Sequence, residues 1–211
     1  MFLFTRQATP MGSPREVMAY ATEITDVVNS KVDTTTTLWQ NLFGAPVGTL
    51  LWNTLVRSRA QLGATMMTIM ADDDVQRQME RGLEFASDKI ATEDFLARFV
   101  FGHPEEPPGV GYVAEAVAAV AAADRMADAM AWGPQIAQKV GEIGGTTPSF
   151  WTSAYGTVGQ IMWMTVYPSL EALDEAQDRL QSSEEYMTEV AKGMDLFVPG
   201  SGQRSSAMRV H

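Results

Sequence analysis

The sequence carries the same spacing of tryptophan and glycine residues twice. The segment LWQNLFGAPVGTLLWNTLVRS (38–58) is followed, about half a chain later, by FWTSAYGTVGQIMWMTVYPSL (150–170). Four positions match between the copies: Trp39 with Trp151, Gly44 with Gly156, Gly48 with Gly159, and Trp52 with Trp163. The offset is 112 residues for the first two pairs and 111 for the last two. Such a repeat constrains the fold more than composition does, because both copies must build the same structural unit.

The repeat extends beyond this segment in both directions. Upstream, MAY (18–20) aligns with MAW (130–132), and downstream, DDVQRQMERGLEF (73–85) aligns with EEYMTEVAKGMDL (184–196). Because the offset stays at 112 or 111 over four blocks, we expect the chain to consist of two equivalent units.

Each unit has the pattern strand, helix, strand, strand, helix, strand. β-Branched and aromatic residues predict the strands, and Pro14 after Ser13 indicates the start of the first helix. The first unit is expected to have strands at 2–9, 34–44, 48–56 and 94–102, and helices at 15–30 and 58–88, the latter broken at 71–74. The second is expected to have strands at 110–120, 149–156, 160–167 and 205–210, and helices at 124–142 and 170–196. This order is that of the ferredoxin-like unit.

The domain organisation follows from a segment rich in proline and glycine. GHPEEPPG (102–109) cannot join a central strand ladder, so we expect a first repeat at 1–101, a linker, and a second repeat at 110–211. A ferredoxin-like unit leaves one sheet face bare, which the second unit can cover if the two sheets close into a barrel. The predicted fold class is α+β, with two tandem ferredoxin-like repeats forming a dimeric-α/β-barrel-type architecture within one chain. Closure against a second chain, as a homodimer, is the alternative.

Composition narrows the partners and the chemistry. The formal net charge of −11 repels phosphate backbones and anionic lipid, so neither nucleic acid nor a membrane is expected as a partner. The chain has no cysteine for a thiolate site, and its two histidines, His103 and His211, are too few for a multi-histidine metal site. We expect no metal and no cofactor. The N-terminus lacks the pattern of a signal peptide and no segment is long and apolar enough to span a bilayer, which predicts a cytoplasmic protein.

The second hairpin resembles a known family. In FWTSAYGTVGQIMWMTVYPSL, an aromatic strand, a glycine turn, an apolar strand, a tyrosine and a Ser-Leu helix start occur in the order seen in the NIPSNAP-like branch of the dimeric α/β-barrel superfamily. The positions that carry the resemblance are Gly156, Gly159, Tyr167, Ser169 and Leu170. The first copy departs from it, with Val56 in place of the tyrosine. The superfamily includes cofactor-free antibiotic-biosynthesis monooxygenases, aromatic polyketide cyclases, EthD-like proteins and haem enzymes such as chlorite dismutases, so the resemblance implies a pocket in the barrel interior.

Strand alternation sorts the hairpin residues into two faces. On one face we expect aromatic and polar side chains: Trp39, Asn41, Phe43, Trp52, Thr54 and Val56, with their copies Trp151, Ser153, Tyr155, Trp163, Thr165 and Tyr167. This mixed face suits a cavity for a planar organic ligand. The opposite face of the second strand is more apolar and suits helix packing: Leu51, Asn53 and Leu55, with copies Met162, Met164 and Val166. The alternative is that the tryptophans simply fill the core.

The candidate catalytic residues are polar residues at positions where the two copies differ: Tyr155 in place of Phe43, Tyr167 in place of Val56, and Asn41 with its counterpart Ser153. The candidate substrate-binding residues are Trp39, Trp52, Trp151, Trp163, Thr54 and Thr165. Hydroxyl, amide or indole N–H groups can stabilise a phenolate or enolate, which is often a large catalytic effect. The leading prediction is therefore a cofactor-independent oxygenase or cyclase that acts on a small aromatic or polyketide-like metabolite. A non-catalytic NIPSNAP-like binding or scaffold protein is the second candidate, and a haem protein, for which His103 is the interior histidine, is the third.

Charged residues outside the hairpins are expected to have structural rather than catalytic roles. The acidic clusters at 72–74 and 184–185 occupy the same repeat position, where a helix restarts and negative groups interact favourably with its N-terminus. Arg6, Arg98 and Glu115 lie in predicted strands, where a charged side chain usually faces solvent.

Overall fold

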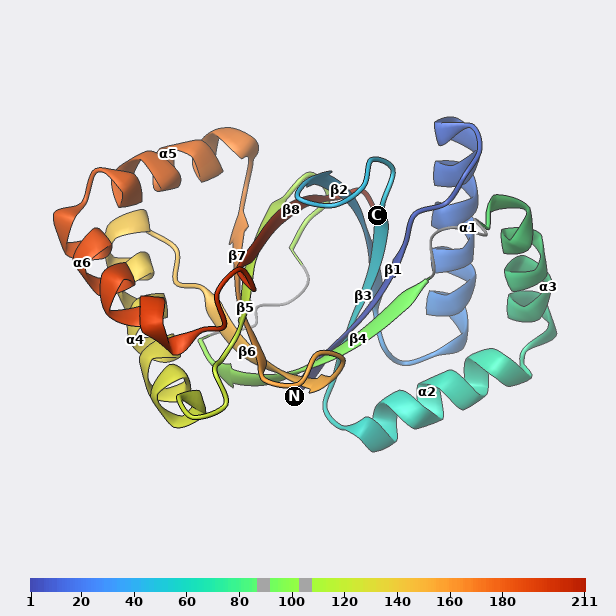
Figure 1. The fold of residues 1–211 in the computed structure, drawn as a ribbon. Coiled ribbons are helices and arrows are strands. Elements are labelled where there is room, and N and C mark those ends of the chain that lie inside the picture. The colour runs from blue at the N-terminus through green and yellow to red at the C-terminus, as the bar shows by residue number, and fades with distance from the viewer. Residues whose placement is uncertain (87–91, 103–107) are drawn as a thin grey trace.

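The chain forms a closed β-barrel with helices packed against two opposite sides (Figure 1). The structure is a computed structural model that describes residues 1–86, 92–102 and 108–211. In this part of the chain eight strands close in the order β1-β3-β2-β8-β5-β7-β6-β4, and all neighbouring strands are antiparallel. The observed class is thus α+β, and one chain closes the barrel without a second.

The two halves contain the same elements in the same order. The first half consists of β1 (Phe2–Ala8), α1 (Pro14–Lys31), β2 (Thr36–Phe43), β3 (Leu50–Val56), α2 (Arg59–Ala71), α3 (Asp73–Gly82) and β4 (Glu93–Phe101). The second consists of β5 (Val113–Val120), α4 (Met126–Gly144), β6 (Ser149–Tyr155), β7 (Gln160–Tyr167), α5 (Leu170–Gln181), α6 (Glu184–Gly193) and β8 (Gln203–Arg209). A short 3-10 turn follows α3 and another follows α6. The long helix predicted at 170–196 is therefore two helices, α5 and α6, which correspond to α2 and α3 of the first half.

Register also matches between the halves. The strands lie in the order β4-β1-β3-β2 in the first half and β8-β5-β7-β6 in the second. Phe2 pairs with Val56 and Val113 pairs with Tyr167, so the 111-residue offset of the sequence holds in the sheet. The halves join through β2 with β8 and β4 with β6.

The repeated glycines lie in the hairpin turns and have a structural reason. Gly44 has a φ of 85° and Gly156 a φ of 124°, in the region that only glycine adopts readily. A side chain on Gly44 would also collide with the carbonyl oxygen of Arg204 on β8. Glycine is therefore required here by both the turn and the closure of the barrel.

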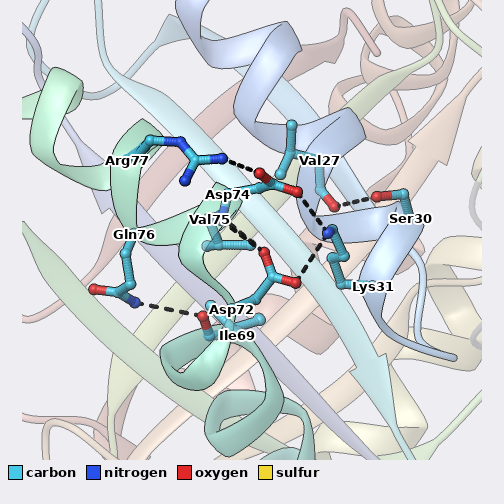
Figure 2. A network of polar contacts seen from close by, with 9 residues as sticks. All are labelled: Val27, Ser30, Lys31, Ile69, Asp72, Asp74, Val75, Gln76 and Arg77. Atoms are coloured by element: carbon cyan, nitrogen blue, oxygen red, sulfur yellow. Dashed lines mark hydrogen bonds and ion pairs between the residues drawn. The ribbon is translucent and has the colours of Figure 1, made fainter.

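The acidic cluster at 72–74 starts a helix, as the sequence predicts. Asp72 ends α2 and caps α3, because its carboxylate accepts hydrogen bonds from the backbone N–H groups of Asp74 and Val75 at 3.0 and 3.1 Å. The ammonium of Lys31, at the end of α1, lies 2.9 Å from Asp72 and 2.8 Å from Asp74 (Figure 2). These contacts tie the junction of α2 and α3 to α1. In the other half Ser183 caps α6 in the same way.

The barrel interior contains one tryptophan from each half. Trp39 and Trp151 are 4% and 1% exposed. Each indole N–H donates to a hydroxyl on its own strand at 2.8 Å, Trp39 to Thr37 and Trp151 to Ser149. Trp151 packs with interior side chains of several strands: Leu3, Leu55, Phe95, Ala97, Phe99, Met162 and Met164.

The expected assignment of the two faces of β3 and β7 is wrong. Leu55, Met162 and Met164, which we expected under the helices, lie in the interior with Trp151. Trp52 and Trp163 instead face the helices, because their indole groups hydrogen-bond to α1 and α4 respectively. Among the described residues, no helix is long and apolar enough to cross a membrane.

Candidate functional site

A cavity of about 590 Å³ lies between the helices of the first half and the outer face of their sheet. Its floor is formed by β1, β2 and β3, and its cover by α1, α2 and α3 (Figure 1). Most of the lining is apolar, with side chains such as Phe4, Ile24, Met66, Ile69, Met70, Val75 and Met79. A cavity of this size and character suits a small, mainly apolar organic molecule.

The matching layer of the second half is filled by aromatic rings. Trp163 lies 5.3 Å from Phe150, 5.7 Å from Trp132 and 6.1 Å from Phe197, measured between ring centroids. Phe150 is fully buried in this cluster. Ring pairs at these distances pack favourably and leave little space between sheet and helix.

Three side chains around the first-half cavity are smaller than those at the matching positions of the second half. Leu38 stands where Phe150 does, as the pairing of each with a tryptophan of the next strand shows. By the repeat offsets, Tyr20 stands in place of Trp132, and Ala86 in place of Phe197. Tyr20 and Ala86 both line the cavity. Ring volume is thus lost at these three positions, although Phe85, which also lines the cavity, is larger than its counterpart Leu196.

Trp52 is anchored to the helix through a hydroxyl group. Its Nε1 donates to Thr25 Oγ1 at 3.0 Å, and this hydroxyl donates to the carbonyl oxygen of Ala21 at 2.7 Å. In the second half Trp163 Nε1 donates directly to the carbonyl oxygen of Gly133 at 2.9 Å. Trp52 is therefore held as a fixed aromatic wall of the cavity, with its N–H already satisfied.

A pair of threonine hydroxyls provides a polar group on the cavity floor. Thr36 Oγ1 and Thr54 Oγ1 are 2.8 Å apart across β2 and β3, and both residues line the cavity. The pair has two hydroxyl hydrogens and uses one of them in its own hydrogen bond. The second hydrogen is available to a ligand oxygen, so the pair can donate as well as accept.

The titratable groups of the cavity are a guanidinium and a phenol. Arg6 lines the cavity beside Trp52 and makes a two-pronged pair with Asp94, with both N–O distances 2.8 Å. Hydrogen bonding to Asp94 raises the pKa of Arg6, so this side chain stays charged. Burial raises the pKa of Tyr20, whose hydroxyl donates to the carbonyl oxygen of Gln78 at 3.1 Å. Neither group is a base near neutral pH.

The structure separates the residues that the sequence groups into one site. Trp52 and Thr54 line the first-half cavity. Trp39 and Trp151 lie in the barrel interior, and alternation along β2 and β6 places Asn41 and Ser153 on the same side. Of the other four, three lie on the outer face of the second half, Trp163, Thr165 and Tyr167, and the fourth is Tyr155, which is exposed. Whether any of them acts in catalysis stays a prediction.

Tyr155 and Tyr167, predicted as catalytic, occupy very different surroundings. Tyr155 is 63% exposed, and the guanidinium of Arg59 lies 5.4 Å from its ring centroid. Tyr167 is 3% exposed under α5, where burial, followed by the charge of Glu115, raises its pKa. A β-bulge in the β4–β6 pairing turns Tyr155 away from the interior face.

Asn41 has a structural contact with its own hairpin. Its side-chain amide lies 3.4 Å from the carbonyl oxygen of Ala45, and in the flipped orientation its nitrogen lies 3.1 Å from the carbonyl oxygens of Phe43 and Ser206. The amide is therefore partly used in holding the bulge between β2 and β8.

Some expectations for charged strand residues are corrected. Glu115 does not face solvent, because it is 8% exposed and pairs with Arg204. Arg98 is exposed as expected, whereas Arg6 pairs with Asp94 at the cavity.

No metal site is found in the described residues. They contain no group of three or more His, Asp or Glu side chains placed to hold a metal ion. His103, the residue on which the haem alternative depends, lies outside them, and His211 is engaged with Asp26 at 2.6 Å. The side chains that line the cavity within the described ranges include no histidine.

Sequence analysis missed Thr36, Tyr20 and the helix residues that line the cavity. A signal was present in the repeat itself, because Leu38, Tyr20 and Ala86 are each smaller than the residue at the matching position. Comparing the volumes of paired residues, rather than their polarity, would have drawn attention to these three positions.

Solved structures share this fold. In sequence the chain matches no family profile and no curated protein. A protein from Fusobacterium nucleatum named "Putative monooxygenase" aligns with a TM-score of 0.72 at 7% identity, covering 100% of this chain and 92% of that one. An anthrone oxidase-like protein aligns with a TM-score of 0.67 at 12% identity, covering 100% and 92%. A staphylococcal regulator of pathogenesis aligns with a TM-score of 0.61 at 8% identity, covering 100% of both.

This likeness shows the fold. Identities of this size do not carry an activity from one protein to another, since one fold supports many functions.

Proposed function

We propose that this protein is a monooxygenase-type enzyme that oxidises a small aromatic molecule bound in the first-half cavity. The observation that carries the proposal is the cavity of about 590 Å³, walled by Trp52 and apolar side chains and left open where the second half is filled. The names of two fold neighbours, a monooxygenase and an anthrone oxidase-like protein, support the reaction class.

The proposed reaction needs no bound cofactor. A substrate methylene that is conjugated with a carbonyl through an aromatic ring, as in anthrone, can lose a proton to solvent and give an enolate, which supplies electrons to O₂. The methylene becomes a carbonyl, one oxygen atom enters the product, and the other leaves as water with the two hydrogens. The free hydroxyl hydrogen of the Thr36–Thr54 pair is placed to stabilise the enolate oxygen, and the apolar walls strengthen that hydrogen bond by excluding water.

The same proposal includes the origin of the two halves. The two halves are ferredoxin-like units that arose by tandem duplication, in a chain related to antibiotic-biosynthesis monooxygenases. Support comes from the common element order and from the register that the halves share. The barrel interior, with Asn41, Ser153 and the two buried tryptophans, is the alternative location for the substrate, and there Tyr155 and Tyr167 would have no direct part.

A binding protein without catalysis, including one of the NIPSNAP-like kind, is the second candidate. It is favoured by the lining of the cavity, whose described residues include Arg6 and Tyr20 but no Asp, Glu, His or Lys. A site of this kind can hold a ligand but offers no side-chain base near neutral pH.

The test uses anthrone as substrate and a double variant without the hydroxyl pair. Oxygen uptake and quinone absorbance are measured for the native protein, for Thr36→Val/Thr54→Val, and for Thr165→Val, which changes the matching threonine of the filled half. Valine keeps the shape of threonine, and removing both partners of a hydrogen bond leaves stability nearly unchanged. Removal of an oxyanion donor lowers kcat by about 10²–10³-fold.

We expect quinone formation with one O₂ consumed per product, lost in the double variant and kept in Thr165→Val. Equal activity in all three proteins contradicts the role of the threonine pair. Anthrone binding without oxygen uptake supports the binding protein instead. A fourth protein, Tyr155→Phe/Tyr167→Phe, is measured in the same way. If turnover falls only in this variant, the two tyrosines predicted from sequence are catalytic and the cavity assignment is wrong.

A further inference from the structure

A second groove, also of about 590 Å³, lies on the second half between α5 and the ends of β2 and β8. Its base contains Glu115, which is 8% exposed. Arg204 Nε donates to Glu115 Oε1 at 2.8 Å, and Gln177 Nε2 donates to Glu115 Oε2 at 2.9 Å. The buried carboxylate is thus neutralised and hydrogen-bonded, as a buried charge must be.

The wall above this pair carries uncompensated negative charge. Asp174 and Asp178 lie one helical turn apart on α5, and both line the groove. Within the described ranges neither carboxylate forms an ion pair with Lys or Arg, and both residues are exposed. With Glu115 balanced by Arg204, the groove has a net charge of about −2 and attracts a cation.

An aromatic ring forms the rim of the same groove. Phe43 is 66% exposed at the end of β2 and lines the groove. The face of an aromatic ring attracts cations, and an aromatic ring beside carboxylates is a common way to bind an organic cation.

The matching place in the first half contains a cation of the protein itself. Tyr155 corresponds to Phe43, and Arg59 corresponds to Leu170 of the groove, each by the repeat offset. The guanidinium of Arg59 lies 5.4 Å from the Tyr155 ring centroid and 5.1 Å from that of Phe2. The fold therefore places a cation against this aromatic position in one half, while the other half has leucine in place of the arginine and two added carboxylates.

A buried hydroxyl group in the groove also lacks a partner. Ser206 is 6% exposed, and its Oγ forms no hydrogen bond in the described part of the chain. Ser206 pairs with Glu115 across β5 and β8, so both side chains lie on the outer face, and both line the groove. An N–H donor from a ligand would satisfy this oxygen.

We propose that the groove formed by Phe43, Glu115, Asp174, Asp178 and Ser206 binds an organic cation of the alkylguanidinium or alkylammonium class. The cation lies against the Phe43 ring, and its N–H groups donate to the carboxylates of α5. This site is separate from the first-half cavity and does not depend on the activity proposed for it.

The test compares two probes that have the same shape and differ in charge. Binding of butylguanidinium and of N-butylurea to the full chain is measured by isothermal titration calorimetry at low salt. Three variants are compared: Asp174→Asn/Asp178→Asn, Phe43→Leu, and the control Glu80→Gln/Glu84→Gln, which removes the same charge from the other side of the molecule.

We expect butylguanidinium to bind and N-butylurea not to bind. The Asp174→Asn/Asp178→Asn variant should weaken binding at least tenfold, and Phe43→Leu by about two- to fivefold, in line with a cation–π contribution at an exposed site. Binding in the control variant should be unchanged, which also separates the site from general attraction to an acidic protein. Equal binding of the two probes, or equal losses in the control and in Asp174→Asn/Asp178→Asn, overturns the proposal.

Discussion

The substitution Ala86→Phe should fill the first-half cavity with the side chain that the second half already has. Phe197, at the matching position, lies 6.1 Å from Trp163 between ring centroids and packs against the buried cluster of its half. A phenylalanine at 86 would meet Trp52 in the same way. We therefore expect the variant to become more stable while it loses its ligand.

The size of the stabilisation follows from the packing of Phe197. Full burial of a phenylalanine contributes about 1.5–3 kcal/mol, and Phe197 is only partly buried, so about half of this applies. An aromatic pair adds about 0.5–1.5 kcal/mol, and some of the sum is lost to imperfect fit. A net gain of about 1–2 kcal/mol corresponds to a Tm about 2–8 °C higher for a chain of this size.

The assay is thermal unfolding with and without anthrone, together with the oxygen-uptake measurement. The native protein should show a ligand-induced rise in Tm, whereas Ala86→Phe should have a higher Tm that anthrone does not change. Opposite effects on stability and binding cannot come from partial unfolding. A variant that is more stable and still binds anthrone normally would refute the assignment of the cavity as the binding site.

Two further predictions concern the scaffold. In Gly133→Ala the added methyl group would collide with the Phe150 ring, so we expect the free energy of unfolding to fall by about 1–3 kcal/mol. The control Gly63→Ala, a helix glycine in open space on α2, should raise it by about 0.5–1 kcal/mol. Denaturant titration of both variants checks this. Hydrogen bonding to Lys31, followed by that of the α3 backbone, lowers the pKa of Asp72 in the folded protein. Its contribution to the stability of the fold is therefore complete above its ordinary pKa of 3.8 and is lost as pH falls through the lower folded-state pKa. Asp72→Asn should unfold with a weaker pH dependence below about pH 4, and an acid-unfolding curve like that of the native protein would contradict this.

The sequence predicts the order of the elements well, for a physical reason. The repeated glycines set the hairpin turns, which is a local requirement, and the repeated tryptophans mark the strands that each half must bury. The capping of α3 by Asp72 and of α6 by Ser183 is predictable in the same way, because a cap depends on the adjacent backbone alone.

The faces of the strands could not be assigned from alternation. In this barrel both faces of a strand are buried, one in the interior and one under helices, so Trp39 and Trp52 are both aromatic yet point to opposite sides. Alternation separates two sets of residues but does not say which set is inside. Glu115 was misplaced for a related reason, since its partner Arg204 is far away in sequence.

Closure of the barrel within one chain also removes a constraint on evolution. In a barrel made from two identical subunits, every substitution occurs on both sides of the symmetry axis, so a change that opens one layer opens the other as well. Here the two layers are encoded separately, and Ala86 can differ from Phe197. The ring-filled layer can keep the molecule stable while the other is free to change its contents, so new specificity can arise in one layer without weakening both.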